Sequence, residues 1–154
     1  MFRITQSFLV NSFAEYLREK EWRILYEDYV NGRRSGRGAQ GAINYCFEAI
    51  FDQFPDIVAA KETRMLVVEV DIIYKHKYVE KLKSFGSKEH ELLKCANKSL
   101  NLELTTVDIG MVFQSKPTAS QAKELRGLHV WLYNKASNRF IPYRAMFSTL
   151  YGRQ

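Results

Sequence analysis

Two short apolar runs joined by a polar turn limit what this chain can fold into more than any other feature. The first run begins at Ile57, the turn covers residues 61–64, and the second run extends from Met65 to Ile73. Both runs are rich in Val and Ile and lack a regular polar alternation, which is typical of strands in a sheet that is covered on both faces. The sequence therefore predicts a β-hairpin inside an α/β sheet.

Three carboxylates belong to this hairpin. Asp56 follows Pro55 just before the first strand, and Glu69 and Asp71 lie on the second. Because side chains alternate across a strand, Glu69 and Asp71 share one face while Val70 takes the other. An unpaired buried carboxylate is costly, so these acids bind a cation, pair with Lys or Arg, or lie at a solvent cleft near the strand end.

Pro-Asp followed 13 residues later by Glu-x-Asp resembles the motif of the PD-(D/E)xK nuclease superfamily, which has the restriction-endonuclease-like fold. The resemblance covers about residues 8–114 and implies a three-layer α/β/α arrangement around a central mixed sheet. It implies that Asp56 and Glu69 bind Mg²⁺ or Mn²⁺, with Asp71 as a further ligand or water-orienting acid. Glu15, on the helix expected before the first strand, is an additional candidate ligand. The chain departs from the motif at Asp71, where the family usually has Lys.

Two lysines just beyond the hairpin are candidates for the role of the missing one. Lys75 and Lys77 follow the second strand, and a long side chain from the next helix can reach back to the same cleft. The implied reaction is metal-assisted hydrolysis of a phosphodiester, because oxygen ligands favour Mg²⁺ or Mn²⁺ and such an ion lowers the pKa of bound water. The resemblance thus implies a DNA endonuclease or a resolvase-like enzyme.

Charge is consistent with a polyanionic partner. The 154 residues carry a net charge of +6 and have a pI of about 9.3. We expect them to form one domain, with further strands and an aromatic tail over 115–154. Cationic residues gather in a Gly-rich loop over 31–41 and in an expected helical region over 75–100 that is broken near Gly86. The predicted nucleic-acid contacts are Arg33, Arg34, Arg37, Lys81 and Lys83. The alternative is a flexible surface loop and a solvated helix face.

The remaining features bear on compartment and assembly. Cys46 and Cys95 show no metal-site spacing and are too few for a disulfide framework, so we expect reduced core thiols in a cytoplasmic protein. No stretch has the roughly 20 apolar residues of a membrane span or the core of a signal peptide. The aromatic end of the chain, 140–151, packs on the core or supplies a homodimer contact.

Two other functional classes remain open at this stage. A nuclease-fold protein that has lost catalysis would bind nucleic acid or a protein partner through the arginine loop and the lysine-rich helix. An interaction protein with no nucleic-acid role would have the same basic balance by coincidence. Binding to DNA at two salt concentrations separates the last class from the others, because phosphate contacts weaken steeply with salt.

Overall fold

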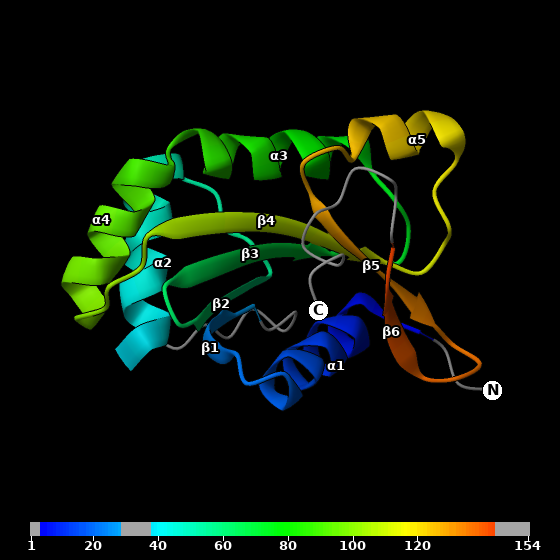
Figure 1. Ribbon diagram of the computed structural model, residues 1–154, viewed down its shortest axis with the longest axis horizontal. Helices are drawn as coiled ribbons and strands as arrows, with labels where there is room; N and C mark the ends of the chain where they lie inside the picture. Colours follow the sequence, from blue (N-terminus) through cyan, green and yellow to red (C-terminus); the bar gives the residue numbers. More distant parts are fainter. Residues whose placement is uncertain (1–3, 29–37, 144–154) are drawn as a thin grey trace.

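A mixed six-stranded sheet forms the centre of the computed structural model, which describes residues 4–28 and 38–143 (Figure 1). The elements in chain order are α1 (Gln6–Glu19), β1 (Arg23–Glu27), α2 (Gly38–Phe51), β2 (Ile57–Lys61), β3 (Arg64–Val70), α3 (His76–Ser87), α4 (Glu89–Leu100), β4 (Thr106–Phe113), α5 (Ala119–Glu124), β5 (His129–Asn134) and β6 (Arg139–Pro142). The predicted hairpin is confirmed as β2 and β3. The break expected near Gly86 is the junction between α3 and α4.

The strands lie in the order in which they occur in the chain, from β1 to β6. The first three form an antiparallel meander, whereas β4 pairs parallel with β3 and β5 pairs parallel with β4. A final antiparallel hairpin adds β6 at the edge. The parallel pairs require crossover connections, and α3 with α4 forms the one from β3 to β4. The molecule is therefore an α/β protein with an open mixed sheet.

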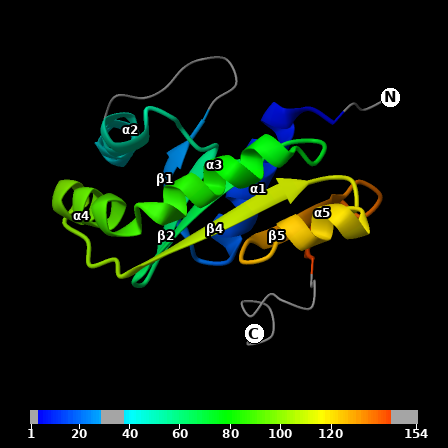
Figure 2. The same cartoon turned by 90° about the horizontal axis from the view of Figure 1, so that it is seen from above.

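Helices cover both faces of this sheet, as the hairpin pattern predicts. Leu9 and Phe13 of α1 pack with Val68 on one face, and Phe47 of α2 and other helical residues pack with Val67 on the opposite face. In Figure 1, α1 lies below the sheet and α3 above it, and Figure 2 shows α3 running along the sheet. Adjacent β3 residues thus enter different cores, which explains why the strand lacks polar alternation.

The N-terminus and the buried face of the first helix follow from local chemistry. Thr5 is the N-cap of α1, and its side chain accepts a hydrogen bond from the Phe8 N–H at 3.1 Å. Val10, Phe13 and Leu17 form its buried stripe.

Within the described residues, no helix is long and apolar enough to cross a membrane.

The two cysteines correct one expectation. Cys46 of α2 and Cys95 of α4 form a disulfide across a Cα–Cα distance of 5.9 Å, so the expectation of reduced thiols is wrong. The two residues are 49 positions apart in the chain, and only the packing of α2 against α4 brings them together. Spacing in the sequence carries no signal of such a contact. The expected cytoplasmic location rested in part on reduced thiols and loses that support.

Candidate active site

Asp56 and Glu69 meet where the β2–β3 hairpin opens. The Asp56 N–H donates to Glu69 Oε2 at 3.0 Å, and the Val70 N–H donates to Asp56 Oδ2 at 2.8 Å. The two side chains therefore cross between adjacent strands, each held by the other strand's backbone. The pairing arises because Ile57 faces Val68 in the antiparallel register, which sets the preceding Asp beside the following Glu. The structure thus brings together the first two acids of the predicted motif.

Lys81 completes this cluster from above the sheet. Its Nζ donates to Glu69 Oε1 at 2.8 Å, and its side chain is 22% exposed, compared with 2% for that of Glu69. Lys81 lies on α3, which covers this face of β3 and β4. The cluster therefore contains two acids and one lysine, and the lysine is supplied by α3 and not by position 71.

Asp71 lies just beyond β3 and has different partners. Its Oδ2 is 3.2 Å from Lys75 Nζ, and its Oδ1 accepts from the Ile72 N–H at 2.6 Å. Tyr78 of α3 also donates its hydroxyl to Asp71; burial and this bond together raise the pKa of Tyr78 to about 12. Asp71 is therefore next to the Asp56–Glu69 pair but is held by side chains of the segment that follows β3.

Burial dominates the electrostatics of the pair. It raises the pKa of Asp56 to about 6, against a partial offset from the Val70 N–H and Lys81 and with further increases from Asp28 and Asp71. It also raises the pKa of Glu69, and the negative charge of Asp56 adds to this increase while Lys81 opposes it. Two carboxylates in one desolvated site cannot both ionise cheaply. An additional cation would relieve that cost.

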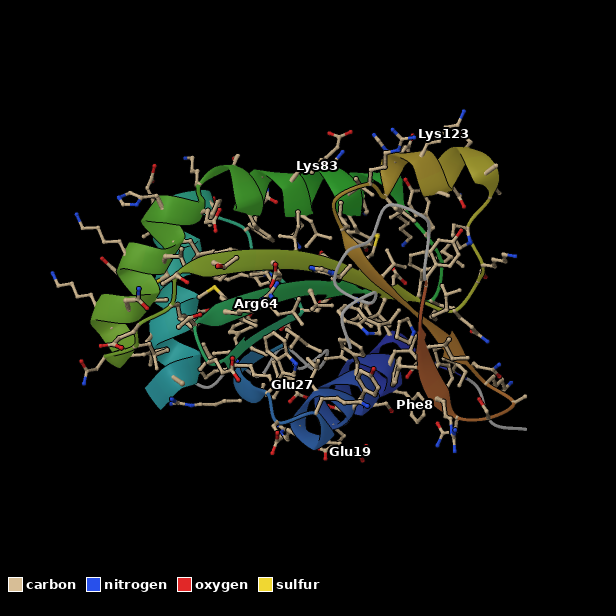
Figure 3. The ribbon with its side chains drawn as sticks, viewed as in Figure 1. Phe8, Glu19, Glu27, Arg64, Lys83 and Lys123 are labelled. Atoms are coloured by element: carbon tan, nitrogen blue, oxygen red, sulfur yellow. A yellow bond between two sulfur atoms is a disulfide. The ribbon has the colours of Figure 1, made fainter. Side chains whose placement is uncertain are left out.

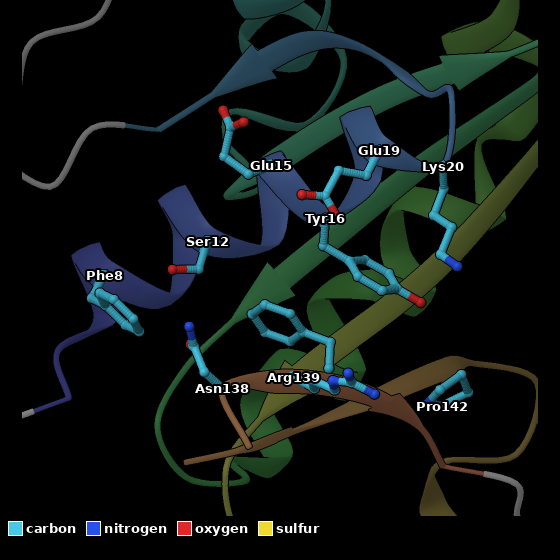
Figure 4. Close-up of a pocket in the computed structure, with 10 residues that line it drawn as sticks. Phe8, Ser12, Glu15, Tyr16, Glu19, Lys20, Asn138, Arg139 and Pro142 are labelled. Carbon is cyan, nitrogen blue, oxygen red and sulfur yellow. The ribbon is translucent and has the colours of Figure 1, made fainter. Parts of the chain in front are cut away.

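The other predicted catalytic and metal residues are at the margin of this cluster or outside it. Lys77 is exposed, with its Nζ 5.3 Å from the centre of the Tyr78 ring. Glu15 is on α1, on the other face of the sheet, where it pairs with Arg18 and lines a groove beside β6 (Figure 4). The structure thus does not bring Glu15 to Asp56, and Asp28 at the end of β1 is the additional acid that does influence it.

The predicted nucleic-acid contacts divide into two groups. Lys83 is exposed on the outer side of α3, away from the sheet (Figure 3), whereas Lys81 points inward to Glu69. Arg33, Arg34 and Arg37 lie outside the described residues. Of the described residues in this set, Lys81 contacts the acidic pair and Lys83 faces solvent.

The donor set determines which cation the site suits. Within residues 4–28 and 38–143, no group of three or more Asp, Glu, His or Cys side chains is arranged to hold a metal ion. Two carboxylates do lie side by side, and Mg²⁺ is commonly bound by one or two carboxylates with water completing its shell. Asp56 and Glu69 are the two carboxylates that such an ion could use; both oxygens of Glu69 already accept hydrogen bonds, from Lys81 and from the Asp56 N–H.

Lys81 was predicted as a nucleic-acid contact, and its position against Glu69 was missed. A signal for it exists in the sequence. Tyr78, Leu82 and Phe85 form the apolar stripe of α3, and Lys81 lies within that stripe at i+3 from Tyr78. A lysine on the buried side of an amphipathic helix needs an acidic partner on the surface that it covers.

Comparison with protein-family models, with curated proteins and with solved structures gave no match to this chain.

Proposed function

We propose that this protein is a metal-dependent DNA endonuclease or resolvase-like phosphodiester hydrolase of the PD-(D/E)xK type. The observation that carries the proposal is the contact of Lys81 with Glu69, beside Asp56. It supplies the acid, acid and lysine of the motif even though Asp71 occupies the usual lysine position. The order α1, β1, hairpin β2–β3, α3 and β4 is the order that the resemblance implies, with α2 added between β1 and the hairpin and α4 between α3 and β4.

Each residue of the cluster has a distinct role in this proposal. Asp56 and Glu69 would hold Mg²⁺ or Mn²⁺, which supplies an acidified water and offsets phosphate charge. Lys81 would release Glu69 to the cation and direct its ammonium group to the attacked phosphate, where negative charge develops. Asp71 would orient the attacking water, with Lys75 and Tyr78 holding its carboxylate in place.

A nuclease assay tests the proposal directly. Supercoiled, linear and branched DNA would be incubated with the purified protein in Mg²⁺ or Mn²⁺, using the wild type, Glu69→Ala and Glu103→Ala. Glu103 is an exposed acid in the loop between α4 and β4 and serves as the matched control. We expect cleavage by the wild type and the control, and a loss of at least about 100-fold for Glu69→Ala. Unchanged cleavage by Glu69→Ala would exclude this site.

A second candidate is a nuclease-fold protein that binds nucleic acid or a protein partner without cleavage. It is favoured by the ion pairs that already occupy the acids, Lys81 with Glu69 and Lys75 with Asp71. DNA binding that weakens steeply with salt, in the absence of cleavage with either metal, supports this candidate over the enzyme.

A further inference from the structure

A cavity lies on the opposite face of the sheet from the acidic cluster. It has a volume of about 410 Å³ and is formed by the carboxyl end of α1, the β2–β3 turn and residues of β3, β4 and β5. It is lined by Tyr16, Leu17, Lys20, Trp22, Lys61, Glu62, Arg64, Leu66, Asp108 and Trp131. A cavity of this size accommodates a small ligand.

Both tryptophans of the chain line this one cavity. Trp131 is 5% exposed and forms part of its floor. The position of Trp131 depends on Gly110, because a Cβ at residue 110 would lie 2.8 Å from the Trp131 ring. The indole N–H of Trp131 donates a hydrogen bond to the Tyr16 hydroxyl. Trp22 is partly buried against the same core and lines the cavity together with Tyr16, whose ring stacks on Phe13 with the ring centres 5.4 Å apart. The cavity therefore offers rigid aromatic surface to a planar ring.

Two lysines stand beside these aromatic residues. Lys61 Nζ donates to the Lys20 main-chain oxygen at 2.9 Å, and Lys20 Nζ lies 5.6 Å from the centre of the Tyr16 ring (Figure 4). The third cation, Arg64, is paired with Asp108 at 2.7 Å. Lys20 and Lys61 are therefore the cations best placed to meet a ligand's negative group, with the exposed Glu62 as the opposing charge at the turn.

We propose that this cavity binds one nucleotide unit, with its base against Trp22 and its phosphate between Lys20 and Lys61. Base stacking on aromatic side chains and phosphate contact with lysine are the two interactions that a nucleotide needs. The larger groove shown in Figure 4 shares Tyr16 and Lys20, but its lining residues include neither a second lysine nor a tryptophan.

This site is separate from the proposed active site. Arg64 and Glu69 are at opposite ends of β3, about 16 Å apart at 3.3 Å per strand residue, and their side chains lie on different faces of the sheet. The proposal therefore does not depend on phosphodiester cleavage. The nucleotide is either free or an unpaired unit of a single strand, and both present the same chemistry.

Tryptophan fluorescence tests the proposal, because each emitter lies in the cavity. The protein would be titrated with thymidine monophosphate, adenosine monophosphate and a thymidylate single strand of eight units, without divalent metal. We expect a saturable change in emission. Much tighter binding of the single strand than of thymidine monophosphate identifies a strand as the source, and equal binding identifies the free nucleotide.

Variants define the site. The double variant Lys20→Gln, Lys61→Gln should raise the Kd for the mononucleotide about tenfold. Trp22→Ala should raise the same Kd roughly tenfold, measured by calorimetry because this variant removes one of the two emitters. The matched pair Lys94→Gln with Lys98→Gln, exposed on α4, should leave the Kd unchanged, as should Glu69→Gln. Thermal unfolding would confirm that each variant is folded.

Three results would overturn the proposal. They are the absence of a saturable signal with every probe, an unchanged Kd in the folded Lys20 and Lys61 double variant, and a changed Kd in Glu69→Gln. The last result would place the nucleotide at the acidic pair. Failure of the nuclease assay, in contrast, has no bearing on this cavity, because the titration contains no divalent metal and measures binding alone.

Discussion

Strand β3 has an ionic cluster at each end, on opposite faces of the sheet, and the two clusters differ in how well their charges are compensated. At one end Glu69 and Asp56 are buried together, and burial raises the pKa of both carboxyl groups against the opposing effect of Lys81. At the other end Asp108 lies 2.7 Å from Arg64 and 3.5 Å from His129 (Figure 3 labels Arg64). Burial alone would raise the pKa of Asp108, but hydrogen bonds from His129 and Arg64 outweigh it and lower that pKa.

The difference separates a structural cluster from a candidate functional one. An acid whose partners lower its pKa stabilises the fold when ionised, whereas an acid whose pKa is raised destabilises the fold when ionised. Groups of the second kind persist where they have another use, such as binding a cation or a substrate. The comparison therefore predicts opposite responses to the same chemical change at the two ends of β3.

The largest expected effect is on the proposed DNA cleavage, at the end of β3 that holds Glu69 and Asp56. Lys81→Met removes the ammonium group that contacts Glu69, and we expect kcat for DNA cleavage to fall about 100-fold, as for other groups that stabilise developing charge. Lys83→Gln, from the solvent side of α3, should raise KM and leave kcat nearly unchanged. Steady-state kinetics on one duplex substrate measures both.

A control distinguishes this role from a general loss of positive charge. Lys135, in the exposed turn between β5 and β6, should be replaceable by Gln with no change in kcat or KM. Equal losses of kcat in the Lys81 and Lys83 variants would mean that Lys81 acts only through long-range attraction of DNA.

At the compensated end we expect a loss of stability. Asp108→Asn leaves Arg64 and His129 without their shared carboxylate, and the free energy of unfolding at pH 7 should fall by about 1–2 kcal/mol. Because the pKa of Asp108 is lowered in the folded state, its contribution is present above its ordinary pKa of 3.8 and is lost as pH falls below that value. Urea unfolding at pH 7 and pH 3 measures the change; an equal difference at both values would contradict this origin.

The hairpin shows what the sequence can predict. The continuous Val and Ile pattern of β3 identified a strand buried on both faces, and the Pro-Asp and Glu-x-Asp spacing predicted that Asp56 and Glu69 would meet. Both depend on local periodicity and on antiparallel register, which a short stretch of chain determines by itself. The lysine-rich helical region and its break were predicted for the same reason.

The contacts that sequence reasoning missed all join distant segments. The Cys46–Cys95 disulfide needs α2 and α4 side by side, and Lys81 reaches Glu69 only because α3 crosses back over β3. Glu15 does not lie beside Asp56 and Glu69, because α1 covers the other face of the sheet. Which face a helix covers is a property of the whole topology, and no local pattern specifies it.

Replacing an Asp by Asn at the Glu69 end of β3 should stabilise the protein, in contrast to Asp108→Asn at the other end. Asp56→Asn keeps an oxygen for the Val70 N–H and removes a charge that burial disfavours. In a chelating buffer at pH 8 we expect the free energy of unfolding to rise by about 1–2 kcal/mol, below the upper bound of roughly 3 kcal/mol that a shift of about 2 pKa units sets at about 1.36 kcal/mol per unit. The folded pKa is raised from 3.8 to about 6, so the wild type loses stability as pH rises through this range, and the variant should match it below pH 3.8. A destabilised variant at pH 8 would show that the ionised carboxylate is well compensated.

The smallest expected effect links the acidic pair to its cation. A ligand that binds only the folded state stabilises it by RT ln(1 + [L]/Kd), so Mg²⁺ at about ten times its Kd should add about 1.4 kcal/mol to the wild type and raise Tm by about 3–5 °C. Asp56→Asn and Glu69→Gln should show little of this increase, whereas Asp108→Asn should show all of it. NaCl at matched ionic strength controls for screening. If Mg²⁺ raises the Tm of Asp56→Asn as much as that of the wild type, the ion binds elsewhere, and the contrast between the two ends of β3 would reflect packing alone.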